Sequence, residues 1–178
     1  MHQSKLDQLM SKVKKGQMAR HEYQYISDLL GDKNFLVFGT GYDTDFWRYC
    51  NKDGLNLFLE HDEQWILESS NDTHLINYST EISKYQEYLT DFSLLEMTLP
   101  KDVLETSWDI IFVDGPPGNK KTSFGRMQSI YTAWKLASNQ TDIFVHDCDR
   151  VVEDTYTKYF FNITKELVKL RHCSKKNI

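Results

Sequence analysis

Cysteine is scarce in this chain, whose 178 residues include only Cys50, Cys148 and Cys173. The three are widely spaced and form no Cys-x-x-Cys pair, which excludes the disulfide framework of a small secreted protein. An odd number of dispersed cysteines is typical of reduced thiols. We therefore expect a cytoplasmic location.

Long apolar runs and an excess of positive charge are also absent. No apolar run approaches the ~20 residues that span a membrane, and the N-terminus has no signal-peptide core. The 21 Lys and Arg against 26 Asp and Glu give a net charge of −5, which implies no basic face for nucleic acid. We expect neither a membrane nor a nucleic acid as a partner.

What the chain does contain is an ordinary globular composition, with 40% hydrophobic and 26% charged residues. Its length suffices for one domain with a sizeable core. Neither an internal repeat nor a low-complexity linker divides it. We predict a single domain over residues 1–178, with N-terminal helices in 1–33 and a sheet core in 34–178.

The stretch around which the chain is organised runs from Asn34 to Trp47. Its apolar run 35–38 predicts a strand that is buried on both faces. Gly39 and Gly41 follow, and glycines permit a sharp turn and the close approach of a ligand. A strand, a glycine turn and a following helix form the nucleotide-binding corner of a doubly wound α/β domain.

Beyond the glycines, either Asp43 or Thr44 can cap the next helix. Thr44 also stands where the full dinucleotide-binding pattern has a third glycine. The Gly-x-Gly pair is weak evidence by itself, because a tight turn between a strand and a helix needs no ligand.

Strand-like and helix-like segments alternate along the whole chain. The predicted strands are 35–38, 55–60, 74–78, 108–114, 142–146 and a final strand at 166–173, in a hairpin. The predicted helices are 6–13, 19–30 (with Gly31 as its C-cap), 44–49, 65–67, 82–89, 127–134 and 151–160. This alternation is typical of a mostly parallel sheet with helices on both faces. The two N-terminal helices are expected to cover the opening of the sheet.

Three of the buried strands end in polar residues, namely Glu60, Asp114 and the pair His146 and Asp147. In an open α/β sheet, ligands bind at the carboxyl ends of the strands, near the point where the strand order reverses. One polar strand end means little, because loops are polar. Three such ends beside a glycine turn predict a ligand site.

Glu60 lies about twenty residues beyond the glycine turn, where a carboxylate can accept hydrogen bonds from both hydroxyls of an adenosine ribose. The corner therefore implies a nucleoside-bearing cofactor. A nicotinamide-dependent dehydrogenase normally needs a further substrate domain, and no residues remain for one. A methyltransferase that uses S-adenosylmethionine fits its chemistry into one sheet of this size.

Five segments make the prediction more specific. They are 34–43 (NFLVFGTGYD), 58–62 (FLEHD), 108–116 (WDIIFVDGP), 125–132 (GRMQSIYT) and 142–150 (DIFVHDCDR). In this order they resemble the polysaccharide-biosynthesis methyltransferase family, whose best-known members are the plant glucuronoxylan 4-O-methyltransferases. The similarity runs from about Gln17 to His172, and the last two segments are its most distinctive part.

The resemblance implies a class I methyltransferase fold, S-adenosylmethionine as cofactor and methyl transfer to a sugar hydroxyl, in xylan the 4-hydroxyl of a glucuronic acid branch. The plant members carry an N-terminal membrane anchor that is not seen here, and this chain is shorter before Trp108. We expect a saccharide or small-molecule acceptor, either a uronic-acid-containing glycan, a smaller glycan or a soluble metabolite. The expected cofactor-binding residues are Phe38, Gly39, Thr40, Gly41, Glu60, His61 and Asp114.

Methyl transfer to an oxygen requires that the oxygen lose its proton. His146, Asp147 or Asp114 is expected to act as the general base, and His146 has the most suitable intrinsic ionisation. Alternatively, Asp114 and Asp147 hold a divalent cation, Mg²⁺ or Mn²⁺, that lowers the pKa of the acceptor hydroxyl. Because successive strand residues point to opposite faces, only one of His146 and Asp147 is expected to face the methyl group.

Two arginines, Arg126 and Arg150, are candidates for binding a carboxylate of the substrate. The alternative for each is an ion pair with a local Asp or Glu. For the chain as a whole, two other functions are kept as alternatives. One is a cofactor-binding module without turnover, and the other is a nicotinamide-dependent reductase, which the missing third glycine disfavours.

Overall fold

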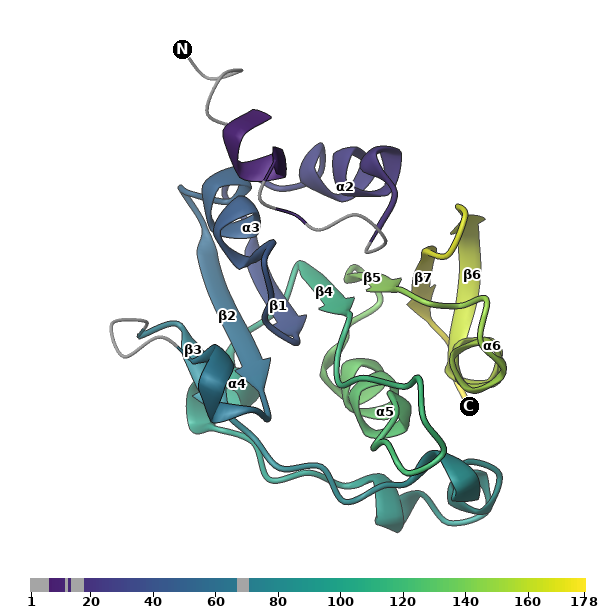
Figure 1. The fold of residues 1–178 in the computed structure, drawn as a ribbon. Coiled ribbons are helices and arrows are strands. Elements are labelled where there is room, and N and C mark those ends of the chain that lie inside the picture. Colours follow the sequence, from purple (N-terminus) through teal and green to yellow (C-terminus); the bar gives the residue numbers. More distant parts are fainter. Residues whose placement is uncertain (1–6, 12, 14–17, 67–70) are drawn as a thin grey trace.

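A computed structural model of the protein describes residues 7–11, 13, 18–66 and 71–178. Its centre is a seven-stranded sheet with the strand order β3-β2-β1-β4-β5-β7-β6 (Figure 1). The strands are β1 (Asn34–Phe38), β2 (Leu55–Glu60), β3 (Thr73–Leu75), β4 (Ile110–Val113), β5 (Asp142–Val145), β6 (Phe161–Glu166) and β7 (Arg171–Lys175). Neighbours from β3 to β5 are parallel, whereas β7 runs antiparallel to β5 and β6. The predicted mostly parallel sheet is confirmed.

The α-helices lie on both faces of this sheet, as predicted. They are α2 (Arg20–Ser27), α3 (Thr44–Cys50), α4 (Lys101–Glu105), α5 (Met127–Leu136) and α6 (Val151–Phe160). In Figure 1, α2 and α3 lie in the upper part of the view and α5 and α6 in the lower part. Four short 3₁₀ helices connect them, η1 (Glu63–Trp65), η2 (Ile82–Lys84), η3 (Glu87–Leu89) and η4 (Phe92–Leu95).

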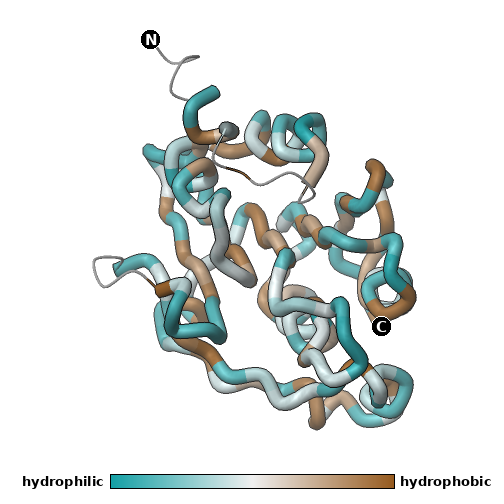
Figure 2. The backbone as a smooth tube through the Cα atoms, in the orientation of Figure 1, coloured by the Kyte–Doolittle hydropathy of each residue, from teal (hydrophilic) through white to brown (hydrophobic). Residues whose placement is uncertain are grey.

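The core consists of two hydrophobic clusters, one on each face of the sheet. Alternate residues of β1 divide between them, since Phe35 and Val37 pack against α2 and α3 while Leu36 and Phe38 pack on the opposite side. Figure 2 colours the backbone by hydropathy and shows hydrophobic and hydrophilic stretches alternating along the chain. Burial on both faces explains why these strands appear in the sequence as continuous apolar runs.

The register of the parallel strands brings their carboxyl ends to one edge. Phe38 at the end of β1 pairs with Leu59 of β2 and with Val113 of β4, and Val113 pairs with Val145 of β5. The loops that follow these strands therefore begin side by side at the same edge of the sheet. The switch in strand order lies between β1 and β4, where the site was expected.

Several element boundaries differ from the prediction. Helix α2 ends at Ser27 with Asp28 as its C-cap, so Gly31, although its φ is +135°, is not the cap. The stretch 82–89 forms two 3₁₀ turns rather than one helix. At the C-terminus the predicted hairpin is present, but its strands are β6 and β7, with a turn between Leu167 and Leu170 inside the predicted strand 166–173.

Other predictions concern the ends of the chain and its cysteines. Residues 7–11 are helical and Leu9 is buried, while Leu6 and Leu67 lie outside the described residues. None of the helices in the described ranges is long and apolar enough to cross a membrane. The three cysteines are free thiols, and burial raises the pKa of the Cys148 thiol to about 12.

Candidate active site

A cavity of about 380 Å³ lies at the carboxyl ends of β1, β2, β4 and β5. The structure brings most of the predicted site residues to its wall. They are Gly39, Thr40, Glu60, His61, Asp114, Arg126, His146, Asp147 and Arg150. Gly41 lines a smaller adjoining cavity instead, and Phe38 lines neither, because its side chain is fully buried in the core.

The glycine corner is a point of very close backbone approach. Gly39 has a φ of +107°, which side chains rarely adopt, and a Cβ there would lie 3.1 Å from the backbone nitrogen of Gly115. A Cβ on Gly115 would in turn lie 2.8 Å from the Cα of Gly39. The two loops that follow β1 and β4 therefore touch without side chains between them, and both glycines line the cavity.

Glu60 ends β2 inside the cavity, with only 3% of its surface exposed. Its Oε2 accepts hydrogen bonds at 2.8 Å from both the backbone N–H and the hydroxyl of Thr40. Its Oε1 accepts from the backbone N–H groups of His61 and Asp62, and His61 Nδ1 lies 2.7 Å away. The carboxylate thus already holds both loops together. Ribose hydroxyls can join it by displacing the two donors that rotate, the Thr40 hydroxyl and the His61 ring.

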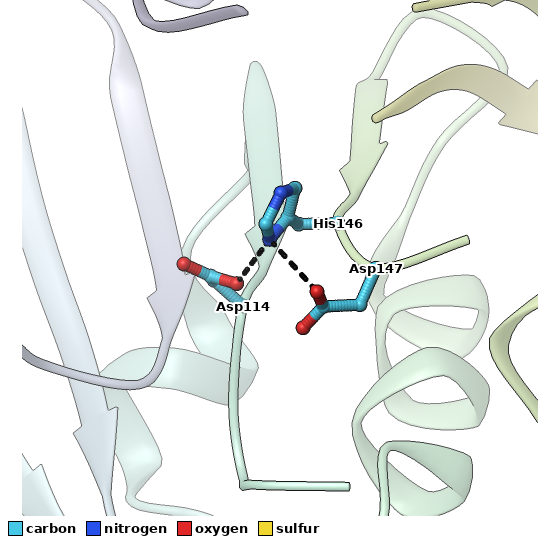
Figure 3. Close-up of side chains that lie close together, drawn as sticks. All are labelled: Asp114, His146 and Asp147. Atoms are coloured by element: carbon cyan, nitrogen blue, oxygen red, sulfur yellow. Dashed lines mark hydrogen bonds and ion pairs between the residues drawn. The ribbon is translucent and has the colours of Figure 1, made fainter. Parts of the chain in front are cut away.

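Asp114, His146 and Asp147 form one cluster, which we call the charged edge (Figure 3). Nδ1 of His146 lies 3.0 Å from Oδ1 of Asp114 and 3.7 Å from Oδ1 of Asp147. Strand β5 stops at Val145, and Asp147 adopts a φ of +61°. This left-handed turn ends the alternation of the strand, so both His146 and Asp147 face Asp114. The expectation that only one of the two would face the site is therefore wrong.

Arg126 lies beneath the charged edge and is 3% exposed. Its Nη2 lies 3.0 Å from Oδ1 of Asp114 and 2.7 Å from Oδ2 of Asp147. It also donates at 2.7 Å to the backbone carbonyls of Asp114 and His146. The Arg126 guanidinium is thus occupied by groups of the protein itself. This agrees with the alternative that Arg126 forms ion pairs with local Asp residues, and not with the prediction that it binds the substrate. Burial alone would raise the pKa of the Asp114 carboxyl, but Arg126 and His146 outweigh it and lower that pKa.

Arg150 is placed differently from Arg126. About a third of its side chain is exposed, and Nη2 lies 3.0 Å from Oδ2 of Asp147. Its Nη1 is buried without a hydrogen-bond partner, as are both carboxylate oxygens of the neighbouring Glu153. Burial raises the pKa of Glu153. Arg150 therefore brings a part-exposed guanidinium side chain to the cavity wall, which suits a ligand carboxylate, whereas its unpaired Nη1 is closed off from solvent.

Helix α2 contributes two side chains that the sequence did not assign to the site. Oε2 of the buried Glu22 lies 4.0 Å from Nε2 of His146. The hydroxyl of Tyr23 donates to Oδ2 of Asp43 at 3.1 Å, and Asp43 follows the glycine corner. Asp43 was considered only as a helix cap. No local pattern relates either residue to its partner about twenty or more positions away.

The charged edge offers a donor set for a divalent cation. One ligand atom each from Asp114, His146 and Asp147 lies within 4.8 Å of the others. Two carboxylate oxygens and an imidazole nitrogen suit Mn²⁺ and similar ions. The guanidinium of Arg126 contacts one oxygen of each carboxylate, which leaves the second oxygen of each without that partner. The residues present therefore fit a cation.

Comparison with known proteins gives matches over nearly the whole chain. The family model described as IRX15/IRX15L/GXM matches residues 21–98 and 90–172. Glucuronoxylan 4-O-methyltransferase 1 of Arabidopsis thaliana is 32% identical over 88% of this chain and 67% of its own length. Arabinogalactan O-methyltransferase 1 of the same plant is 31% identical over 74% of this chain and 55% of its own length. The chain thus spans between about half and two thirds of these relatives.

Two solved structures show the same fold. An S-adenosylmethionine-dependent O-methyltransferase from Thermotoga maritima has a TM-score of 0.51 and 12% identity, covering 97% of this chain and 71% of its own. The MycE methyltransferase of mycinamycin biosynthesis, solved with Mg, S-adenosylhomocysteine and mycinamycin VI, has a TM-score of 0.54 and 12% identity. It covers 97% of this chain and 48% of its own. The predicted class I methyltransferase fold is confirmed.

Proposed function

The chain belongs to the IRX15/IRX15L/GXM family, and from this premise we propose that it is an S-adenosylmethionine-dependent O-methyltransferase that acts on a saccharide hydroxyl. The observation that carries the proposal is a single cavity in which the glycine corner and Glu60 meet the charged edge. One part of this wall suits a nucleoside, and the other suits the removal of a proton from an oxygen. Relatives that methylate glucuronoxylan and arabinogalactan support a glycan as acceptor.

The residues of the cavity fit the cofactor. Gly39, Thr40 and Gly115 bring backbone to the cavity wall, and Glu60 supplies a carboxylate for ribose hydroxyls. The side chains of Trp65 and Tyr78 offer ring surfaces in the same cavity for an adenine. When bound, S-adenosylmethionine supplies a methyl group on a positively charged sulfur. The chain's task is then to align an acceptor oxygen with that methyl group and to take its proton.

The proton of the acceptor is removed at the charged edge. Nδ1 of His146 already faces Asp114, and Nε2 faces Glu22 on helix α2. Nε2 makes no hydrogen bond, so a nitrogen is free for either role. The position of Nδ1 between the two carboxylates favours His146 as a cation ligand together with Asp114 and Asp147. A divalent cation held there would lower the pKa of an acceptor hydroxyl. His146 as the general base stays the alternative.

Arg150 is the residue of choice for a carboxylate on the acceptor. It lines the cavity, and about a third of its side chain is exposed. A uronic acid carries a carboxylate on the sugar ring, and a guanidinium binds such a group through paired hydrogen bonds. We therefore propose a uronic-acid-containing glycan as the acceptor, with Arg126 positioning the charged edge from beneath.

Calorimetry and an acceptor screen test the proposal. S-Adenosylmethionine and S-adenosylhomocysteine should both bind to the purified chain, and NAD should not. Methyl transfer should then be detected with uronic-acid-bearing oligosaccharides in a panel that also holds neutral glycans and small metabolites. Binding of NAD alone would contradict the cofactor. Cofactor binding with no transfer to any acceptor would favour the module without turnover.

A chelator separates the two roles of the charged edge. If a cation acts there, removal of metal should abolish transfer, added Mg²⁺ or Mn²⁺ should restore it, and Asp147→Asn should lose Mn²⁺ binding in calorimetry. Full activity in chelator would leave His146 as the base. The cytoplasmic location stays a prediction, which localisation of the tagged chain can check.

A further inference from the structure

Helix α2 places a carboxylate against the side of the His146 ring that points away from Asp114. This carboxylate belongs to Glu22, which is 1% exposed and has its Oε2 4.0 Å from Nε2 of His146. The other ring nitrogen, Nδ1, lies 3.0 Å from Oδ1 of Asp114 and 3.7 Å from Oδ1 of Asp147 (Figure 3). The ring therefore has carboxylates on both sides, those of the cavity wall at Nδ1 and an enclosed one at Nε2.

Nε2 of His146 depends on Glu22 for a polar neighbour. It is buried and has no hydrogen-bond partner among the described residues. A ring nitrogen is a donor if it carries a proton and an acceptor if it does not. A bare Nε2 would direct its lone pair toward the oxygens of Glu22, whereas a protonated Nε2 directs an N–H group toward them. The separation of 4.0 Å is about 1 Å longer than an N–H···O hydrogen bond, so a small shift of the ring closes it.

Glu22 is held firmly in this position by the main chain. Its Oε1 accepts hydrogen bonds from the backbone N–H of Lys169 at 2.8 Å and of Leu170 at 3.0 Å. Its Oε2 accepts from the backbone N–H of Ala19 at 2.8 Å. The donors belong to the turn of the C-terminal hairpin and to the N-cap of α2, so the carboxylate is fixed from two sides. Both oxygens act as acceptors, and what Glu22 offers to the ring is therefore an acceptor as well.

We propose that Glu22 is a positioning residue for His146, which holds the ring's proton at Nε2 and so keeps the lone pair of Nδ1 directed at the charged edge. This inference rests on the proposed function, in which His146 acts there as a cation ligand or, alternatively, as the base. An acceptor behind a metal-binding histidine fixes the orientation of the ring, and its loss typically costs about 10–100-fold in metal affinity. Glu22 lines neither of the two cavities with which the glycine corner is associated, so it acts through His146.

Nitrogen-15 NMR of the histidine rings in the full chain shows where the proton lies, with the His146 signals assigned from a His146→Asn variant. In the wild type, Nε2 should carry the proton both without a cation and with the diamagnetic Mg²⁺. Glu22→Gln keeps one acceptor oxygen for the backbone of Lys169 and Leu170 but turns a donor toward Nε2. The proton should then move to Nδ1, and calorimetry should show Mn²⁺ binding weakened about 10–100-fold.

A matched control and a second ligand separate positioning from general stability. Asp142→Asn removes a carboxylate 2.7 Å from Nε2 of another histidine, His172, and should leave the affinity for Mn²⁺ unchanged. The affinity of Glu22→Gln for S-adenosylhomocysteine should also be unchanged. An equal loss for both ligands in Glu22→Gln, or no loss of Mn²⁺ affinity, would overturn the inference.

The wild-type ring decides the matter if Glu22→Gln does not fold. A wild-type His146 whose Nε2 lacks the proton would overturn the inference, with or without a bound cation. A wild type that binds neither Mn²⁺ nor S-adenosylhomocysteine would count against the proposed function instead, and the position of the ring proton would still test the role of Glu22.

Discussion

Asp43 and Asp114 line the same small cavity from two sides, yet the protein treats their charges in opposite ways. Asp114 lies 3.0 Å from Arg126 and has a lowered pKa, whereas Asp43 has a tyrosine hydroxyl as its partner and a pKa raised to about 6. We call the charged edge the acceptor half of the site and the surroundings of Asp43 and Glu60 the cofactor half. In the acceptor half, the carboxylates of Asp114 and Asp147 are paired with arginines of the chain. The cofactor half keeps a buried carboxylate, Asp43, for which the described residues provide no ion pair.

The largest expected effect follows from removing the cation on the balanced side. Arg126→Met leaves the buried Asp147 with only the part-exposed Arg150 and leaves Asp114 with only His146, which should lower the free energy of unfolding by about 3–5 kcal/mol. Denaturant unfolding at neutral pH measures it. Arg150→Met is the matched control, since its ion pair is part exposed and should contribute about 1 kcal/mol or less. Equal losses in the two variants would show that the network is not held by Arg126.

The next effect separates the two halves by their kinetics. His146→Ala should lower turnover about 10²–10⁴-fold and leave the affinity for S-adenosylhomocysteine within about twofold, because the ring lies at the charged edge. His61→Ala, beside Glu60, should do the reverse and act mainly on affinity. Steady-state rates and calorimetry on both variants make the comparison. A His146→Ala enzyme with full turnover would remove the charged edge from the chemistry.

A smaller effect is expected at Glu60, which belongs to the cofactor half but is fully hydrogen-bonded in advance. Glu60→Ala should weaken S-adenosylhomocysteine by about 1–3 kcal/mol, because it loses an acceptor for the ribose and frees the loops at Thr40 and His61. Glu60→Gln keeps one acceptor oxygen and should lose less. Affinity unchanged in both, measured by calorimetry, would place the nucleoside elsewhere.

The smallest effect is a pH dependence of stability. The pKa of Asp43 rises from its ordinary value of 3.8 to about 6 in the folded chain, so the folded state binds the extra proton in this window. The protonated Asp43 carboxyl therefore contributes to the free energy of unfolding below about pH 4, and this contribution is lost as the pH rises through about 6. Asp43→Asn should remove this loss and raise the unfolding free energy at pH 7 by on the order of 1 kcal/mol. Thermal unfolding of both proteins between pH 4 and 7.5 tests it.

Asp114 gives the opposite sign and serves as the internal control for that measurement. Its pKa is lowered, so its contribution is present above the unfolded-state pKa and is lost as the pH falls. Asp114→Asn should therefore reduce stability at pH 7. If Asp114→Asn and Asp43→Asn shift the free energy of unfolding at pH 7 in the same direction, the two carboxylates do not differ in how the protein compensates their charge.

Much of the fold was predictable because its signals are local. Strand β2 and helix α6 begin and end where the apolar pattern placed them. The meeting of Glu60, Asp114 and His146 at one cavity followed from parallel strands, whose carboxyl ends share an edge. The chain's own glycine pattern then indicated which edge carried the ligand site.

What the sequence could not supply depends on contacts between distant segments or on single backbone angles. The left-handed turn at Asp147 cannot be read from a run of apolar residues, and it alone reverses the expected direction of that side chain. The role of Arg126 depends on carbonyls that approach it only after folding. The pairing of Tyr23 with Asp43 likewise joins a helix and a loop that no periodicity connects.

Glu22 of helix α2 has a consequence for the order in which the protein forms. Its Oε1 accepts hydrogen bonds from the backbone of Lys169 and Leu170, about 147 residues further along the chain. During synthesis these partners leave the ribosome roughly 7–30 s after the helix, at 5–20 residues per second. Until then Oε1 of this carboxylate lacks these two backbone donors, although Ala19 N–H donates to Oε2. The contacts of helix α2, which also carries Tyr23, are therefore complete only after the last hairpin has been synthesised.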